Sequence, residues 1–349
     1  MKVATHPASS LLATASRTGR MSKTVRCYAT TSTSPAPAPL PQSGKISTPS
    51  EYCEDLVRRL DPDAWMTAHF WPRHAVKSKS PDGKDTELRD MWLAWRAFNL
   101  ELHQVQVNVK QPTIALMRYQ FWRDALKGIW EDKPPNHPVA LMLHQAKLAR
   151  PVQRYYLKQM IDVRANSLSA PTSHPTLQAH LDHHAPLQNA LLLGPLPLLL
   201  PPTHPSTSAH SHTLTHLSSL LTTTSLLRGL PLHVSNRRFT LPRDIALKNG
   251  LVEEQVFRDG GETKGLRDAC FEIGTRGMDE LITARSHLKE TGGKVVPGEV
   301  MPLFLSAVPA ERYLKRLEAL DFNPFHPDLQ KADWKLAPGV WWSNWTGKL

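Results

Sequence analysis

The sequence has few cysteines and no disulfide pattern. Cys27, Cys53 and Cys270 lie far apart among 349 residues, and none of them belongs to a Cys-x-x-Cys pair. This spacing excludes a disulfide scaffold and a paired-cysteine zinc or redox site, so we expect a reducing compartment. Because 40% of the residues are hydrophobic and ten are tryptophans, the chain has enough apolar material for a packed core.

The signatures of several large enzyme classes are also missing. The chain contains no Gly-x-Ser-x-Gly, no Gly-x-x-x-x-Gly-Lys-Ser/Thr, no Gly-x-Gly-x-x-Gly and no His-Glu-x-x-His. These absences argue against hydrolase, phosphate-loop, dinucleotide-binding and zinc-protease chemistry. Histidines are frequent between 180 and 216, but no carboxylate-supported metal spacing accompanies them. We therefore interpret them as solvated side chains.

Acidic residues are absent from the first fifty positions. The same stretch is rich in Ser, Thr and Ala, and it holds six basic residues of a chain whose net charge is +11. Such a composition predicts a mitochondrial transit peptide over 1–28, cleaved between Tyr28 and Ala29, because Arg26 lies two residues before an aromatic residue. The alternative is a disordered basic tail that contacts nucleic acid or acidic lipid. Since the rest of the chain is only mildly basic, we expect no nucleic-acid partner.

A proline-rich linker over 29–49 should lead into a helical body over 50–335. Thr48, Pro49 and Glu51 form a helix-start signal, with an N-cap threonine and a glutamate three residues later. Apolar periodicity and proline stops predict helices over 49–60, 87–106, 112–133, 138–149, 152–165, 242–249, 263–289, 299–305 and 309–320. No period-two run with hairpin turns is present, so the predicted fold class is all-α.

Two of these helices have defined apolar stripes. The stripe of the helix over 87–106 consists of Met91, Trp95, Phe98, Leu102 and Val105. The stripe of the helix that starts at Pro112 consists of Ile114, Met117, Phe121 and Ile129. We expect both stripes to face the core.

The centre of the chain has no charge of either sign. Residues 183–227 contain no Asp, Glu, Lys or Arg and consist mostly of Leu, Pro, Ser, Thr and His. This composition predicts a low-complexity, divergent segment over 183–225. It has two explanations, a shifted reading frame in the gene model or real divergence, and in the second case we expect the segment to fold loosely. Its leucine run is too short and too often interrupted by proline to cross a bilayer as a helix.

Several segments together resemble the squalene and phytoene synthase superfamily. They are Trp95-Arg96-Ala97-Phe98-Asn99-Leu100-Glu101-Leu102, Met117-Arg118-Tyr119-Gln120-Phe121-Trp122, Leu226-Leu227-Arg228-Gly229-Leu230-Pro231, Phe239-Thr240-Leu241-Pro242-Arg243-Asp244 and Asp321-Phe322-Asn323-Pro324-Phe325-His326-Pro327. Within that superfamily they are similar to the mitochondrial branch of respiratory complex I assembly factors. The resemblance covers about 52–335 and implies an isoprenoid-synthase-like helical bundle.

In the enzymes of the superfamily, two aspartate-rich motifs hold Mg²⁺ ions against a diphosphate. The resemblance implies that the first motif falls on His103 and Val107, and the second on Gly229, Leu232 and His233. These residue types cannot replace carboxylates around Mg²⁺. We therefore expect a pseudoenzyme without catalytic residues, bound metal or cofactor.

Basic and aromatic residues remain as candidates for binding. Anion or partner binding is expected of Arg96, Arg118, Arg123, Arg228, Arg237 and Arg238, with surface ion pairs as the alternative. The set Trp95, Phe98, Phe121 and Trp122 has helical spacing and should be core. In a tail over 336–349, Trp341, Trp342 and Trp345 either contact a membrane surface or dock on the body.

The resemblance implies a non-catalytic assembly factor for respiratory complex I in the mitochondrial matrix, peripheral to the inner membrane. Its implied partners are assembly intermediates or a membrane-arm subunit. The alternatives are a prenyl-diphosphate transferase that uses other ligands and a carrier that encloses an isoprenoid or another lipid.

Overall fold

The computed structural model describes residues 48–73, 75–76, 86–290 and 295–349. The predicted transit peptide and nearly all of the predicted linker lie outside these residues. The described part is helical apart from one two-residue antiparallel pair, β1 (Ala75–Val76) with β2 (Thr86–Glu87). The predicted all-α class is therefore confirmed.

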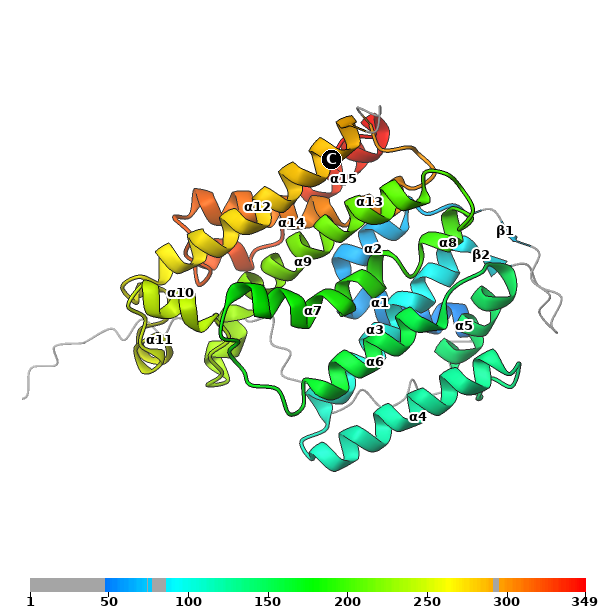
Figure 1. Ribbon diagram of the computed structural model, residues 1–349, viewed down its shortest axis with the longest axis horizontal. Helices are drawn as coiled ribbons and strands as arrows, with labels where there is room; N and C mark the ends of the chain where they lie inside the picture. Colours follow the sequence, from blue (N-terminus) through cyan, green and yellow to red (C-terminus); the bar gives the residue numbers. More distant parts are fainter. Residues whose placement is uncertain (1–47, 74, 77–85, 291–294) are drawn as a thin grey trace, which may run out of the picture.

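Each predicted helix is present, but α2, α7, α8, α9, α11 and α15 were not predicted (Figure 1). The first group is α1 (Pro49–Leu60), α2 (Pro62–Ala68), α3 (Leu88–Asn108), α4 (Pro112–Trp130), α5 (Pro138–Ala149) and α6 (Arg154–Asn166). The centre of the chain forms α7 (Leu177–Leu192), α8 (Leu196–Leu199) and α9 (Thr207–Ser235). The remainder forms α10 (Arg243–Lys248), α11 (Glu253–Asp259), α12 (Leu266–Glu290), α13 (Met301–Phe304), α14 (Ala307–Ala319) and α15 (Leu336–Thr346), with short 3₁₀ turns η1 (Gly260–Glu262) and η2 (Pro327–Gln330).

The predicted start of α1 is confirmed. The Thr48 hydroxyl accepts a hydrogen bond from the Glu51 amide at 3.2 Å, and the Glu51 carboxylate accepts one from the Thr48 amide at 3.3 Å. This reciprocal capping box satisfies two backbone donors that the helix leaves without internal partners. At the other end of the body, Gly250 ends α10 in the left-handed conformation with φ 66°, as its position predicted.

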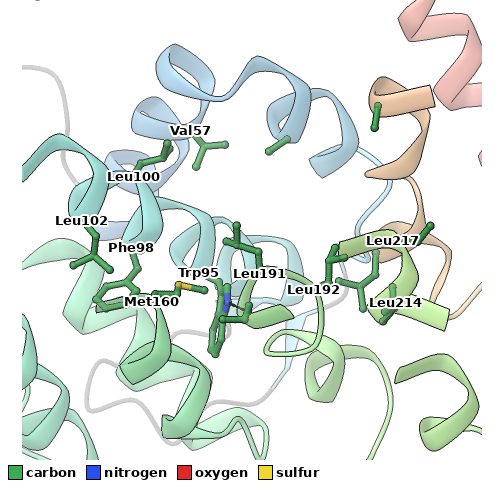
Figure 2. Packing of buried hydrophobic residues seen from close by; sticks show 14 of the residues in the cluster. Val57, Trp95, Phe98, Leu100, Leu102, Met160, Leu191, Leu192, Leu214 and Leu217 are labelled. Carbon is green, nitrogen blue, oxygen red and sulfur yellow. Dashed lines mark hydrogen bonds between the residues drawn. The ribbon is translucent and has the colours of Figure 1, made fainter. Parts of the chain in front are cut away.

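Helix α3 is the centre of the first group. All five residues of its predicted stripe are buried, and α3 packs against α1, α5, α4 and α6. Figure 2 shows how Trp95 and Phe98 of α3 meet Met160 of α6 and Leu191 of α7 in the same core. The Phe98 ring meets the Trp122 ring edge-on, with centroids 5.2 Å apart, so α4 is attached to the same cluster.

The second group is built on the long pair α9 and α12, with α14 and α15 beside it (Figure 1). Gly277 lets these two helices approach closely, because a Cβ at that position would lie 2.5 Å from the Thr223 Oγ1 atom. Helix α7 packs against both α6 and α9 and thereby joins the two groups. None of the helices in the described part of the chain combines the length and apolar character needed to cross a membrane.

The expectation of a loose segment over 183–225 is wrong. The segment forms most of α7, all of α8 and the first two-thirds of α9. Its leucines are core residues: Leu191, Leu192, Leu196, Leu198, Leu200, Leu214, Leu217 and Leu220. A segment without charge is compatible with helix here because α9 is buried by neighbours on most of its surface.

Hydroxyl groups explain how α9 buries so many polar residues. The Ser218 hydroxyl donates to the Leu214 carbonyl at 3.1 Å, and the Thr222 and Thr224 hydroxyls donate to the carbonyls of Ser218 and Leu220 at 2.8 Å. Each bond reaches one turn back along the same helix, so the hydroxyl needs no partner from another element. Composition alone did not indicate this arrangement.

The predicted stripe of α4 is also largely wrong. Ile114, Met117 and Phe121 are exposed, whereas Ile129 is buried. The face that packs on the body is one-quarter turn away and consists of Ala115, Tyr119, Trp122, Ala125, Leu126 and Ile129. Helix α4 has two apolar stripes, and the Tyr119 hydroxyl, which donates to the Leu102 carbonyl at 3.2 Å, lies on the inward one.

Two isoleucines of α4 provide a matched test of this packing. Ile129→Ala should lower the free energy of unfolding by about 2–5 kcal/mol, because a fully buried side chain leaves a cavity. Ile114→Ala, at a residue that is 43% exposed, should change it by less than about 0.5 kcal/mol. Urea unfolding of both variants measures the difference. Equal losses would contradict the assigned orientation of α4.

Candidate functional site

A polar pocket lies where the two helix groups meet. Its volume is about 240 Å³, and residues of α2, α3, α6, α7, α9 and α14 line it. The charged lining residues are Asp61, Asp63, Arg96, Arg164 and Arg228. Leucines of α7 and α9 and Pro309 of α14 supply an apolar part of the wall. The pocket is thus positioned by elements that are far apart in the sequence.

Two of the predicted arginines line this pocket and form ion pairs there. Arg96 of α3 donates to Asp61, the N-cap residue of α2. Arg228 of α9 donates to Asp63 at 2.7 Å and lies over the Tyr313 ring of α14, with its guanidinium carbon 5.0 Å from the centroid. Each pocket carboxylate is therefore already paired with a guanidinium group.

Sequence reasoning missed the third cation of the pocket, Arg164 of α6. Its guanidinium donates to Gln106 Oε1 at 3.0 Å and to Asn99 Oδ1 at 2.8 Å, and it lies 3.3 Å from His103 Nδ1. Burial lowers the pKa of Arg164 to about 10, and its Nε atom has no hydrogen-bond partner. Within the described residues, no ion pair joins Arg164 to a carboxylate.

One signal in the sequence could have indicated this site. Arg96, Asn99, His103 and Gln106 follow one another at spacings of three and four residues along α3, a helix that is otherwise largely apolar. That spacing places them on one face, and Arg164 contacts the last three of them. The sequence of α6 contains no comparable signal, because an isolated arginine in a helix is usually a surface residue.

The structure brings two of the predicted motif positions together. Burial, the charge of Arg164 and the charge of His233 lower the pKa of His103 to about 4. Burial, and then the neighbouring Arg238, also lower the pKa of His233. Gly229 adjoins the His233 ring, since a Cβ at 229 would lie 3.3 Å from it.

Other residues at or near the expected motif positions point elsewhere. Val107 and Leu232 are about half exposed. Glu101 lies about 200° around α3 from His103 and accepts a hydrogen bond from the Tyr52 hydroxyl of α1 at 2.6 Å. This carboxylate therefore contacts α1 and does not belong to the pocket lining.

The remaining predicted arginines do not join the pocket. Arg123 pairs with Asp162 at 3.0 Å, and Arg237 pairs with Glu254 at 3.3 Å. Arg118 is exposed on α4, and Arg238 is exposed just beyond α9. Of the six predicted binding arginines, only Arg96 and Arg228 reach the pocket.

Seven histidines form two groups, which the expectation of solvated side chains did not foresee. The first contains His174, His180, His183 and His184, and the second contains His212, His216 and His287. His180 is buried, with its Nδ1 atom unpartnered. In each group three ligand atoms lie within 4.8 Å of one another, close enough to share a metal ion. Imidazole nitrogens suit transition metals and are poor ligands for Mg²⁺, so neither group replaces an aspartate-rich motif.

The C-terminal tryptophans lie away from the pocket. The predicted tail over 336–349 is instead mainly helix α15, which packs on α14 near the end of the chain (Figure 1). Trp341, Trp342 and Trp345 remain exposed on it.

The histidines predict a specific loss of stability in mild acid. Burial is the main cause that lowers the pKa of His180 to about 4 and of His184 to about 3, against about 6.5 in an unfolded chain. Between pH 6.5 and 4 the unfolded state therefore binds more protons, so the free energy of unfolding falls as the pH falls. Urea unfolding at pH 7.5 and pH 5 measures this change, and equal or greater stability at pH 5 would contradict it.

Three kinds of comparison relate this chain to known proteins. The family model of squalene/phytoene synthase matches residues 85–338. The chain is 30% identical over 295 residues to NADH dehydrogenase (ubiquinone) complex I, assembly factor 6, of Mus musculus, a match that covers 84% of this chain and 81% of the relative. The Drosophila melanogaster homolog of that assembly factor is 25% identical, with 90% of this chain and 89% of the relative covered.

Solved structures show the same fold. A dehydrosqualene synthase in complex with ligand superposes with a TM-score of 0.68 at 12% identity, covering 84% of this chain and 94% of the other. A squalene synthase from Alicyclobacillus acidocaldarius superposes with a TM-score of 0.61 at 15% identity, with coverages of 79% and 95%. These matches confirm the predicted isoprenoid-synthase-like bundle, and together with the family model they show that the chain belongs to the squalene/phytoene synthase family.

Proposed function

We propose that this protein is an assembly factor for mitochondrial respiratory complex I that acts by binding and not by catalysis. The Mus musculus and Drosophila melanogaster relatives that carry the assembly-factor name cover 84% and 90% of the chain, which supports the role. The observation that carries the non-catalytic part is the composition of the pocket. Its three guanidinium groups outnumber its two carboxylates, and both carboxylates are engaged in ion pairs.

This charge balance disfavours a cluster of Mg²⁺ ions. A diphosphate-processing site needs several carboxylates, because each Mg²⁺ ion is held by hard oxygen ligands. Here His103 and His233 stand at expected motif positions, and Arg164 supplies an unneutralised positive charge beside His103. The pocket therefore suits an anionic group, such as a carboxylate of a protein partner, better than a metal.

We further propose that the protein works in the mitochondrial matrix at the inner membrane, where it contacts assembly intermediates or a membrane-arm subunit. Targeting would depend on residues 1–28, with cleavage between Tyr28 and Ala29. Contact with the membrane would be peripheral.

The role predicts a selective defect in cells. Deleting the gene should remove assembled complex I and leave the other respiratory complexes at normal levels, which native gel electrophoresis measures. A copy with His103→Ala and His233→Ala should restore complex I, because no turnover depends on those positions. Normal complex I in the deletion strain would refute the proposed role.

A prenyl-diphosphate transferase is the second candidate, and one observation favours it. Asp61 and Asp63 are two carboxylates that line the pocket from outside the predicted motif positions. A lipid carrier is less well supported, since a pocket of about 240 Å³ with five charged residues is small and polar for an isoprenoid.

Mg²⁺ alone distinguishes the enzyme from the binding protein. If the paired carboxylates do not bind the ion, millimolar Mg²⁺ should leave the melting temperature unchanged. A rise that the Asp61→Asn variant abolishes would favour the transferase, and Asp162→Asn, which removes a carboxylate paired with Arg123 outside the pocket, is the matched control.

A further inference from the structure

Helix α15 presents an apolar face to solvent. Trp341, Trp342 and Trp345 are 55%, 57% and 68% exposed, although tryptophan is highly buried on average in folded proteins. We propose that this face binds the surface of a phospholipid bilayer that contains anionic lipids.

The apolar character covers the whole outward side of the helix. At 100° per residue, Ala337, Pro338 and the three tryptophans fall on one side, and all five are exposed. The opposite side carries the buried Val340 together with Leu336, and it packs on α14. Helix α15 contains no charged residue between Leu336 and Thr346. Its polarity is thus the reverse of an ordinary surface helix, which turns its charged side to water.

The apolar face is rigidly held at both ends of the helix. Before α15, the Arg312 guanidinium makes a bidentate ion pair with Asp333 at 2.6 and 2.9 Å, and the Asp333 carbonyl accepts the Leu336 amide at 3.0 Å. After α15, the Gly347 carbonyl accepts the Val296 amide at 2.8 Å. The fold therefore holds the three indoles outward, and none of them is part of the core.

The aromatic side chains suit a lipid interface better than a hydrocarbon core. The Trp341 and Trp345 rings are stacked with an interplanar angle of 8°, and Trp342 lies 5.4 Å from Trp345 by ring centroids. Indole rings prefer the head-group region, where the ring lies among lipid groups and the N–H donates to a polar acceptor. A single helix of 11 residues cannot span a bilayer but can lie along its surface.

Charge next to the helix favours anionic lipid. Lys335 precedes α15 and Lys348 follows it; both are exposed, and no carboxylate is paired with either within the described residues. The Lys335 ammonium lies over the exposed Trp334 ring, 5.4 Å from its centroid, just before the start of α15. The acid nearest in sequence to the N-terminal end, Asp333, is already paired with Arg312. Two unneutralised lysines beside an apolar face are the pattern of an electrostatically assisted peripheral anchor.

This surface gives a physical basis to the proposed peripheral location and rests on it, but its test does not involve complex I. A flotation assay should mix the full chain with phosphatidylcholine vesicles that contain or lack cardiolipin. We expect binding to the cardiolipin vesicles, and at least about tenfold weaker partitioning for Trp341→Ala/Trp342→Ala/Trp345→Ala. Lys335→Gln/Lys348→Gln should weaken binding about fivefold per lysine and reduce its salt dependence.

A matched control distinguishes specific binding by this face from non-specific adsorption of exposed apolar residues to vesicles. Ile114→Ala/Met117→Ala/Phe121→Ala removes a comparably exposed apolar face from α4 and should leave vesicle binding unchanged. Wild-type binding by the tryptophan variant, or loss of binding by the α4 variant, would overturn the proposal. The proposal would also be overturned if the wild-type chain were a dimer, the tryptophan variant a monomer, and neither bound vesicles. A chain that binds vesicles but whose deletion spares complex I would keep the membrane surface and refute the assembly role.

Discussion

The partly buried guanidinium group of Arg164 is the constraint on which the site depends. It joins α6 to the polar face of α3 through Asn99, Gln106 and His103, all of them uncharged at neutral pH. Removing a charge from water next to neutral partners is costly, which is why the pKa of Arg164 falls to about 10, yet the group stays protonated at pH 7. The same positive charge contributes to lowering the pKa of His103. Arg164 therefore both links α3 to α6 and gives the pocket its excess positive charge.

The excess positive charge distinguishes this pocket from an Mg²⁺-dependent site on the same fold. The fold match with solved synthases establishes the bundle, while the chemistry depends on which residues line the pocket of this chain. Here Asp61 and Asp63 neutralise Arg96 and Arg228, and nothing among the described residues neutralises Arg164. A pocket with excess positive charge attracts anions and repels Mg²⁺. The proposed binding without turnover rests on this balance, and the proposed membrane surface of α15 is separate from the pocket.

The sequence predicted the structure correctly where a pattern was compatible with only one local arrangement. The capping box of Thr48 could be predicted because the cap residues and proline agreed, and the stripe of α3 because its apolar spacing fits only one face. Helix α4 could not, since it has two apolar stripes and only tertiary packing selects the one with Tyr119. The charge-free centre of the chain was misjudged because its hydroxyls bond within α9, an arrangement that composition does not reveal. Arg164 was missed because its importance comes from burial, which the sequence of α6 does not indicate.

The release of inorganic diphosphate from a prenyl diphosphate tests the central claim most directly. The purified full chain would be incubated with farnesyl diphosphate and Mg²⁺, with a dehydrosqualene synthase as the positive control. A pocket dominated by guanidinium groups predicts release no faster than in the absence of protein, with or without Mg²⁺. Mg²⁺-dependent release that Asp61→Asn abolishes would contradict the account, because it would show that the paired carboxylates still assemble a catalytic metal site.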